Sequence, residues 1–148
     1  MYFELSVRIE RPPADVFAFL RDKDLFPQPA GSPVLTLDKT TPGPVGVGTR
    51  YSEVVQMLPL VRGKIRSRIT RFEPSRFLEE DFSGAGMNGH LAYEFVPDGE
   101  ATLLIQRETL EPRGPLRPFA GVIERSLAAK LRERLDSIRH VLESGWEG

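Results

Sequence analysis

Residues 118–144 read PFAGVIERSLAAKLRERLDSIRHVLES, and this stretch decides the fold. Its apolar side chains recur at spacings of three and four residues, which is typical of a helix with one buried face. The predicted buried stripe consists of Phe119, Ala120, Ile123, Leu127, Leu131, Ile138, Val141 and Leu142. At ~1.5 Å per residue such a helix is about 40 Å long, as long as a small domain is wide. We therefore expect the helix to lie across a sheet rather than against another short helix.

The overall composition is that of one globular domain. Apolar residues make up 40% of the 148 residues and charged residues 28%, with a formal net charge of −1. A chain of this length buries roughly 70% of its unfolded surface, which allows a core without disulfides. No segment approaches the run of ~18 apolar residues that a membrane span requires. We therefore predict a single domain over residues 1–148 with no integral membrane association.

The first residues, MYFELSVRIE, alternate apolar and polar side chains and indicate a strand rather than a secretion signal, so the predicted location is the cytoplasm. The chain has no cysteine, and its two histidines, His90 and His140, lie far apart in the sequence. Disulfides, thiolate nucleophiles and sulfur-ligated zinc are therefore excluded, and a histidine metal site is not expected. We predict no metal and no other cofactor.

Most of the remaining chain alternates with the period of strands. Prolines 12 and 13 end the first strand and suit the first turn of a short helix that reaches Asp22. A second helix of one turn is predicted around Leu25 and Phe26, in a proline-rich stretch. A second strand begins at Val34. Further strands are predicted at Thr49–Met57, Val61–Phe72, Phe77–Phe82, His90–Val96 and Thr102–Leu110.

The glycine-rich segment Thr41–Gly48, TPGPVGVG, has the look of a phosphate-binding loop. It lacks the lysine and the following helix of such a loop, and strand residues follow it instead. We interpret it as a tight turn between strands. The short separators along the chain indicate antiparallel neighbours. The predicted class is α+β, with a curved antiparallel sheet of six or seven strands around the long C-terminal helix and two short helices after the first strand.

Four segments carry a resemblance to a known fold family. They are VRIERPPADVFAFLRD at 7–22, PGPVGVGTRYSEVV at 42–55, ITRFEPSRFLEEDF at 69–82 and DGEATLLIQRETLEP at 98–112. In that order they resemble the opening strand and helix, the glycine-rich turn and third strand, the fourth-to-fifth hairpin and the last strand of the START-like (SRPBCC) superfamily. The resemblance is closest to its polyketide cyclase/dehydrase-like branch and implies a helix-grip fold. A tryptophan common after the first helix is replaced here by Phe26-Pro27, which bears on the shape of the pocket mouth.

A stiff helix across a bent sheet encloses space where the inward side chains are small or polar. Tyr51, Glu53 and Val55 share one phase of their predicted strand, and Ile65 shares its phase with the small residues Gly63 and Ser67. A carboxylate among apolar neighbours is either paired or has a raised pKa, so Glu53 is a candidate for ligand contact or proton transfer. The alternative is a solvated position at the rim.

Two further strands and the long helix supply the other candidates. Tyr93 and Phe95 share one phase of the sixth strand, and a buried phenol could orient a polar ligand group. Ile105 and Arg107 make one phase of the seventh strand, which would point Arg107 inward, but the phase of Leu104, Gln106 and Glu108 is the alternative. Leu127 and Leu131 on the helix are expected to face the cavity. Arg134 either closes one end of it or extends to the solvent at its edge.

The leading functional hypothesis is the binding of a small apolar or amphipathic molecule, such as a lipid, an aromatic polyketide or an isoprenoid. The first alternative is a cyclase or dehydratase that uses Glu53, Tyr51 or Arg107, and the second is a cochaperone-like interaction module. The glycine-rich segment Ser83–Gly89 is predicted to be a moving gate. The basic strand with Arg62, Lys64, Arg66 and Arg68 is offset by acidic neighbours, so no nucleic-acid partner is expected, and a homodimer is left open.

Overall fold

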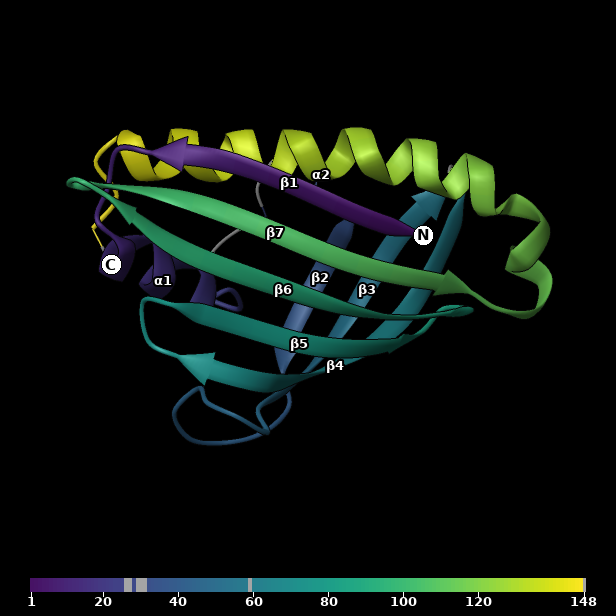
Figure 1. Cartoon of the computed structure of the whole chain (residues 1–148). Helices are drawn as coiled ribbons and strands as arrows, with labels where there is room; N and C mark the ends of the chain where they lie inside the picture. Colours follow the sequence, from purple (N-terminus) through teal and green to yellow (C-terminus); the bar gives the residue numbers. More distant parts are fainter. Residues whose placement is uncertain (26–27, 29–31, 59, 148) are drawn as a thin grey trace.

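The computed structural model of the chain describes all residues except 26–27, 29–31, 59 and 148. One sheet of seven antiparallel strands curves around a long C-terminal helix, as predicted (Figure 1). The elements are β1 (Tyr2–Ile9), α1 (Pro13–Arg21), β2 (Val34–Lys39), β3 (Arg50–Leu58), β4 (Val61–Glu73), β5 (Phe77–Gly84), β6 (Met87–Asp98), β7 (Ala101–Pro112), the 3-10 helix η1 (Gly114–Phe119) and α2 (Ala120–Glu143). Neither of the two α-helices in the described residues is long and apolar enough to cross a membrane.

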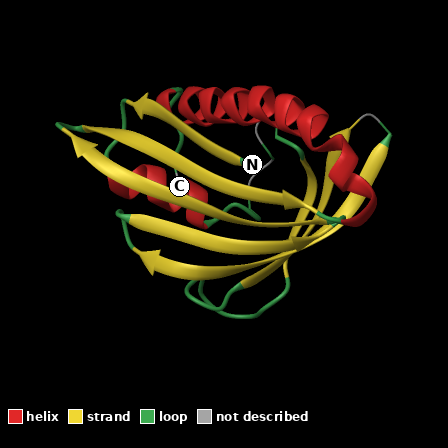
Figure 2. Ribbon diagram, turned by 45° about the vertical axis from the view of Figure 1, so that its right-hand side comes forward, coloured by secondary structure: helices red, strands yellow, loops and turns green. Residues whose placement is uncertain are grey.

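The strands lie in the order β1-β7-β6-β5-β4-β3-β2. From β2 to β7 each strand pairs with the next along the chain, and β1 completes the sheet beside β7. Short turns join these neighbours except β2 and β3, which residues 40–49 connect. The sheet bends so far that α2 contacts both β1 at one edge and β3 near the other (Figures 1 and 2). The concave face and α2 therefore enclose the interior of the protein.

Helix α2 is held by a single ridge of apolar side chains. Six of them are buried: Ile123, Leu127, Leu131, Leu135, Ile138 and Leu142. The predicted stripe was wrong at Phe119 and Val141, whose exposed fractions are 51% and 38%, and it omitted Leu135. The buried positions follow spacings of four and three, which form one straight ridge down the helix. Phe119 lies outside this ridge because prolines turn residues 114–119 into the 3-10 helix, so α2 begins at Ala120.

Helix α1 fills one end of the interior. Its Phe17 packs edge-on against Phe72 and Phe95, with ring centroids 5.2 Å apart in both pairs. The second predicted helix is not seen where the chain is described, because residues 22–25 form a turn and Leu25 is 71% exposed. Phe26, its other predicted anchor, lies outside the described residues.

The predicted gate at Ser83–Gly89 is wrong. Strand β5 runs to Gly84 and β6 starts at Met87, so only Ala85 and Gly86 form the turn. Their φ angles of 53° and 76° suit a two-residue hairpin turn that matches the twist of the strands. The glycines in this stretch therefore serve a tight hairpin and not a flexible loop.

Candidate functional site

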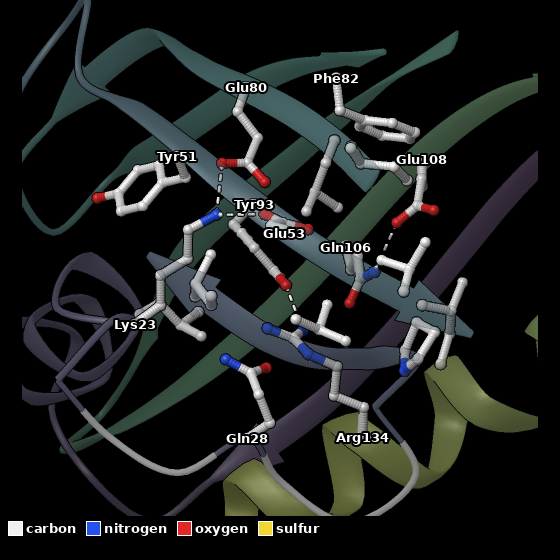
Figure 3. Close-up of a pocket in the computed structure, with 18 of the residues that line it drawn as sticks. Lys23, Gln28, Tyr51, Glu53, Glu80, Phe82, Tyr93, Gln106, Glu108 and Arg134 are labelled. Carbon is white, nitrogen blue, oxygen red and sulfur yellow. Dashed lines mark hydrogen bonds and ion pairs between the residues drawn. The ribbon is translucent and has the colours of Figure 1, made fainter. Parts of the chain in front are cut away.

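A cavity lies between the concave face of the sheet and α2 (Figure 3). Its volume is about 110 Å³ on a scale on which one water takes roughly 10–15 Å³, so it has room for several waters. Apolar side chains from both sides form most of its wall, among them Val55, Ile65, Phe82, Leu127 and Leu131. The interior is therefore open at the point where the sheet and the helix face each other.

A buried cluster of three charges lies on one side of this cavity. Lys23, just after α1, places its Nζ 2.8 Å from Glu80 Oε2 and 3.5 Å from Glu53 Oε1. The three side chains are only 12–18% exposed. The ammonium also lies 4.4 Å from the ring centroid of Tyr51, a cation–π distance. One cation thus holds two carboxylates from β3 and β5 at the cavity wall.

The pKa values in this cluster are displaced from their ordinary values. Burial raises the pKa of Glu53, and the nearby Lys23 only partly offsets this effect. Burial acts to lower the pKa of Lys23, but Glu80 and Glu53 outweigh it, so its pKa is raised and Lys23 stays charged. Ser67 also donates a hydrogen bond of 3.3 Å to Glu53. The cluster combines a fixed cation with a carboxyl group that holds a proton more readily than usual.

A second polar group joins α2 to β6. Arg134 donates a hydrogen bond to the Tyr93 hydroxyl, and its guanidinium lies 5.8 Å from the centre of that ring. Burial raises the pKa of the Tyr93 phenol, while Arg134 lowers it in part. Figure 3 shows both side chains meeting beside the cavity. Arg134 therefore lies inside the fold, and the alternative of an arginine extended to solvent does not hold.

The third polar group lies on β7. Gln106 donates through Nε2 to Glu108 Oε1 over 3.2 Å, and both residues are buried. The other amide atom, Gln106 Oε1, is buried without a hydrogen-bond partner in the described part of the chain. A buried acceptor left unpaired costs about 1–3 kcal/mol. Burial raises the pKa of Glu108 to about 7, against the opposing effect of Arg134. Glu108 can therefore exchange a proton near neutral pH.

Eight of the predicted site residues line the cavity: Tyr51, Glu53, Val55, Ile65, Tyr93, Leu127, Leu131 and Arg134. That they bind a ligand remains a prediction. Tyr51 contributes its ring, and Figure 3 shows its hydroxyl pointing away from the Lys23 cluster. This hydroxyl is buried without a partner in the described residues, and burial raises the pKa of Tyr51 to about 12.

Three predicted site residues lie elsewhere. Ile105 and Arg107 are on the outer face of β7, where Arg107 pairs with Glu94 at 3.0 Å. The inward phase is the alternative one, with Leu104, Gln106 and Glu108 all buried, because this phase continues the apolar residues of the concave face. Phe95 is buried in the core beneath α1, against Phe17, and not at the cavity.

Lys23 and Glu80 were missed in the sequence. The alternation Leu78, Glu80, Phe82 was a usable signal for Glu80, since all three line the cavity. It was hidden in the acidic run of residues 79–81, which suggested an outer face. Lys23 follows the end of α1, outside any helix or strand, so no alternation of apolar and polar residues could indicate that its side chain points inward.

The comparisons with known proteins agree with this architecture. A protein of Deinococcus radiodurans has 18% identity and a TM-score of 0.72, with 99% of this chain and 100% of that chain covered. The Zhui aromatase/cyclase from Streptomyces sp. R1128 has 17% identity and a TM-score of 0.71, covering 95% and 94%. A START superfamily protein from Mycobacterium smegmatis has 14% identity and a TM-score of 0.69, covering 91% and 97%. These similarities show the fold.

A search of curated protein sequences finds no match. The family described as "Polyketide cyclase / dehydrase and lipid transport" matches residues 2–143, from the start of β1 to the end of α2. This match includes every strand and both helices that enclose the cavity. The chain therefore belongs to the polyketide cyclase / dehydrase and lipid transport family.

Proposed function

We propose that the protein binds a small, mostly apolar molecule in the cavity between the sheet and α2. The observation that carries this proposal is an open space at the centre of the fold, walled by Val55 and Ile65 on the sheet and by Leu127 and Leu131 on the helix. Protein interiors otherwise pack to a density of ~0.75, so such side chains would close on each other in an ordinary core. An open space with such walls is what a binding site for an apolar molecule requires.

The polar groups at the wall would orient this occupant. Ligand sites are mostly apolar with a few placed polar groups, and here these come from Lys23 with its two carboxylates, from Arg134 with Tyr93, and from Gln106 with Glu108.

The test is binding of the neutral dye N-phenyl-1-naphthylamine, whose fluorescence rises in an apolar site. We expect micromolar binding and displacement by small polycyclic phenols or ketones. Val55→Trp, which fills the cavity, should weaken binding at least tenfold. Val54→Trp is the matched control, because Val54 alternates to the other face of β3 and does not line the cavity.

If the dye fails to bind, or binds the Val55→Trp protein as well as the wild type, the proposal fails. The cochaperone-like interaction module would then take the lead, although it predicts a filled cavity. Under either function, two earlier statements stay predictions: the cytoplasmic location and the lack of a nucleic-acid partner. Whether the protein forms a homodimer stays open.

The second candidate is an enzyme of the cyclase or dehydratase type that uses the same cavity. Glu108 favours it, because a carboxyl group with a pKa of about 7 can both take and return a proton at neutral pH. In a dehydration the Glu108 carboxylate would remove the proton next to a ketone and return it to the departing β-hydroxyl group, which leaves as water while the conjugated double bond forms. Arg107 plays no part, because it lies on the outer face.

The enzyme candidate is tested with 4-hydroxy-4-phenylbutan-2-one, whose dehydration gives a conjugated enone that absorbs in the near ultraviolet. Catalysis predicts an enone rate above that of buffer, lost in Glu108→Gln and retained in Glu94→Gln, on the outer face beside Arg107. A rate equal to that of buffer would leave binding alone as the function.

A further inference from the structure

One end of the cavity offers hydrogen-bond acceptors without matching donors. Gln106 is 1% exposed and Glu108 is 8% exposed, and the amide nitrogen of Gln106 is turned to Glu108. The amide oxygen of Gln106 has no partner among the described residues, and Figure 3 shows it turned away from Glu108. The hydrogen bond from Gln106 is the one that Glu108 accepts within the described chain. The part of the chain that the structure describes therefore supplies no donor for the Gln106 oxygen at this end of the site.

The charges around the cavity also indicate that a positively charged or hydrogen-bond-donating group is missing there from the described residues. Its wall holds three carboxylates, on Glu53, Glu80 and Glu108, and two cations that lie among them, Lys23 and Arg134. Arg21 also lines the cavity, but its charge is matched by Asp22 at 2.7 Å. Lys23 pairs with Glu80 and Glu53. No ion pair within the described residues reaches Glu108, whose charge meets only the longer-range attraction of Arg134.

The surroundings of Glu108 explain why it needs a partner. In the sheet it lies between Phe3 of β1 and Leu91 of β6, its direct cross-strand neighbours. The charged groups that face it are Arg134 from α2, Glu80 from β5 and Glu53 from β3. Arg134 donates to the Tyr93 hydroxyl, and the two other groups are themselves acidic. Glu108 therefore either takes a proton or meets a cation supplied from outside the chain.

We propose that the occupant of the cavity carries a hydrogen-bond donor, best a protonated primary amine, that lies between the Glu108 carboxylate and the Gln106 amide oxygen. This inference rests on the proposed function and names the ligand class for it. A neutral alcohol or phenol would satisfy one acceptor and bind less tightly. A carboxylate would add a further negative charge to a wall on which Glu53, Glu80 and Glu108 already outnumber Lys23 and Arg134, so the site disfavours fatty acids.

The experiment uses three ligands with the same apolar part: 4-phenylbutylamine, 4-phenylbutan-1-ol and 5-phenylpentanoate. Affinities for the full chain are measured by titration calorimetry at pH 7.5. We expect the amine to bind at least about tenfold more tightly than the carboxylate, with the alcohol between them, since a charge-assisted hydrogen bond is about twice as strong as a neutral one. In Glu108→Gln the amine should lose this advantage while the alcohol changes less than about threefold. Glu94→Gln should behave as the wild type.

A second measurement does not depend on the folding of a variant. As the pH falls from 8 to 5.5, Glu108 gains its proton, so the amine should bind the wild-type protein progressively more weakly while the affinity for the alcohol stays constant. An amine that binds no better than the alcohol, or a carboxylate that binds best, would overturn the inference and leave the proposed function standing. If neither these ligands nor the dye binds, both fail.

Discussion

Lys23 Nζ lies 2.8 Å from Glu80 Oε2, and this ion pair ties the end of α1 to β5 across the cavity wall. The same ammonium reaches Glu53 on β3 at 3.5 Å. All three groups are largely shielded from water. Apolar side chains of α1 also pack against the sheet, but the two carboxylates at the cavity wall depend on this single cation.

Lys23→Met should therefore destabilise the fold strongly. Removing one partner of a buried ion pair leaves uncompensated charge and costs about 3–5 kcal/mol. We expect a loss in that range in urea denaturation at pH 8, because the Lys23→Met variant leaves both Glu53 and Glu80 without their cation. Lys64→Met, on the exposed outer face of β4, is the control and should cost less than about 0.5 kcal/mol. Equal losses for the two variants would mean that the cluster adds nothing to stability.

Glu108 should make the fold less stable as the pH rises. The ordinary pKa of a glutamate is 4.5, whereas the pKa of Glu108 is about 7 in the folded protein. The folded state therefore binds the proton more tightly than the unfolded state. Its contribution to stability is complete below pH ~4.5 and is lost as the pH rises through 7. The shift corresponds to about 3 kcal/mol in total.

Glu108→Gln removes this titration. Between pH 5 and pH 8 the variant should gain about 2.5 kcal/mol of unfolding free energy relative to the wild type, measured by urea denaturation at each pH. Glu94→Gln serves as the reference for a carboxylate on the outer face. A difference between Glu108→Gln and the wild type that stays constant across this range would show that Glu108 ionises like an exposed group.

The topology was predictable because each strand carries its own period and short turns force antiparallel neighbours. The register between β4 and β5 shows how far strand pairing can be predicted from the sequence. If Glu73 and Arg76 paired across their turn, plain alternation would set Arg68 opposite Asp81, and Arg68 does lie opposite Asp81. Glu73 pairs with Phe77 instead, and an irregularity between Ile69 and Arg71 restores the expected register. A bulge of this kind has no signature in the alternation of side chains.

The site was less predictable than the fold, for a physical reason. On β7 both alternating sets of side chains contain apolar residues and charged ones, so the period alone could not choose between Arg107 and Glu108. The choice is made by the neighbours: Phe3 and Leu91 flank Glu108, whereas Glu4 and Glu94 meet Arg107. Contacts between strands far apart in the sequence decide which charge is buried, and a single-strand pattern does not contain them.

The ridge of α2 gives a third prediction, which tests the corrected face of the helix. Leu135 is fully buried, so Leu135→Ala should lower the unfolding free energy by about 2–5 kcal/mol. Val141 was expected in the stripe but is 38% exposed, and Val141→Ala should cost less than about 1 kcal/mol. Chemical denaturation at neutral pH measures both. A larger loss of unfolding free energy for Val141→Ala than for Leu135→Ala would mean that the helix buries the face expected from the sequence.

The last prediction concerns Gly63, which was expected to leave room in the cavity. In the structure the space above it is taken by Ala85 of the β5–β6 turn. A Cβ on Gly63 would lie 2.3 Å from the Ala85 Cβ and 3.1 Å from its Cα. Gly63→Ala should therefore cost about 1–3 kcal/mol through overpacking, as measured by urea denaturation. Gly46→Ala is the control, because a Cβ there meets nothing within 4 Å.

The second variant in this pair, Ala85→Gly, separates the contact from a general intolerance of Gly63. Ala85 has a φ of 53°, a conformation that glycine adopts without strain, so the turn accepts the change. In the double variant most of the loss from Gly63→Ala should be recovered, and the coupling free energy should be at least about 1 kcal/mol. Since neither residue lines the cavity, N-phenyl-1-naphthylamine should bind the double variant as tightly as the wild type. Additive losses in the two single variants would show that Ala85 does not fill the space above Gly63, and weaker dye binding would extend the cavity to this corner of the sheet.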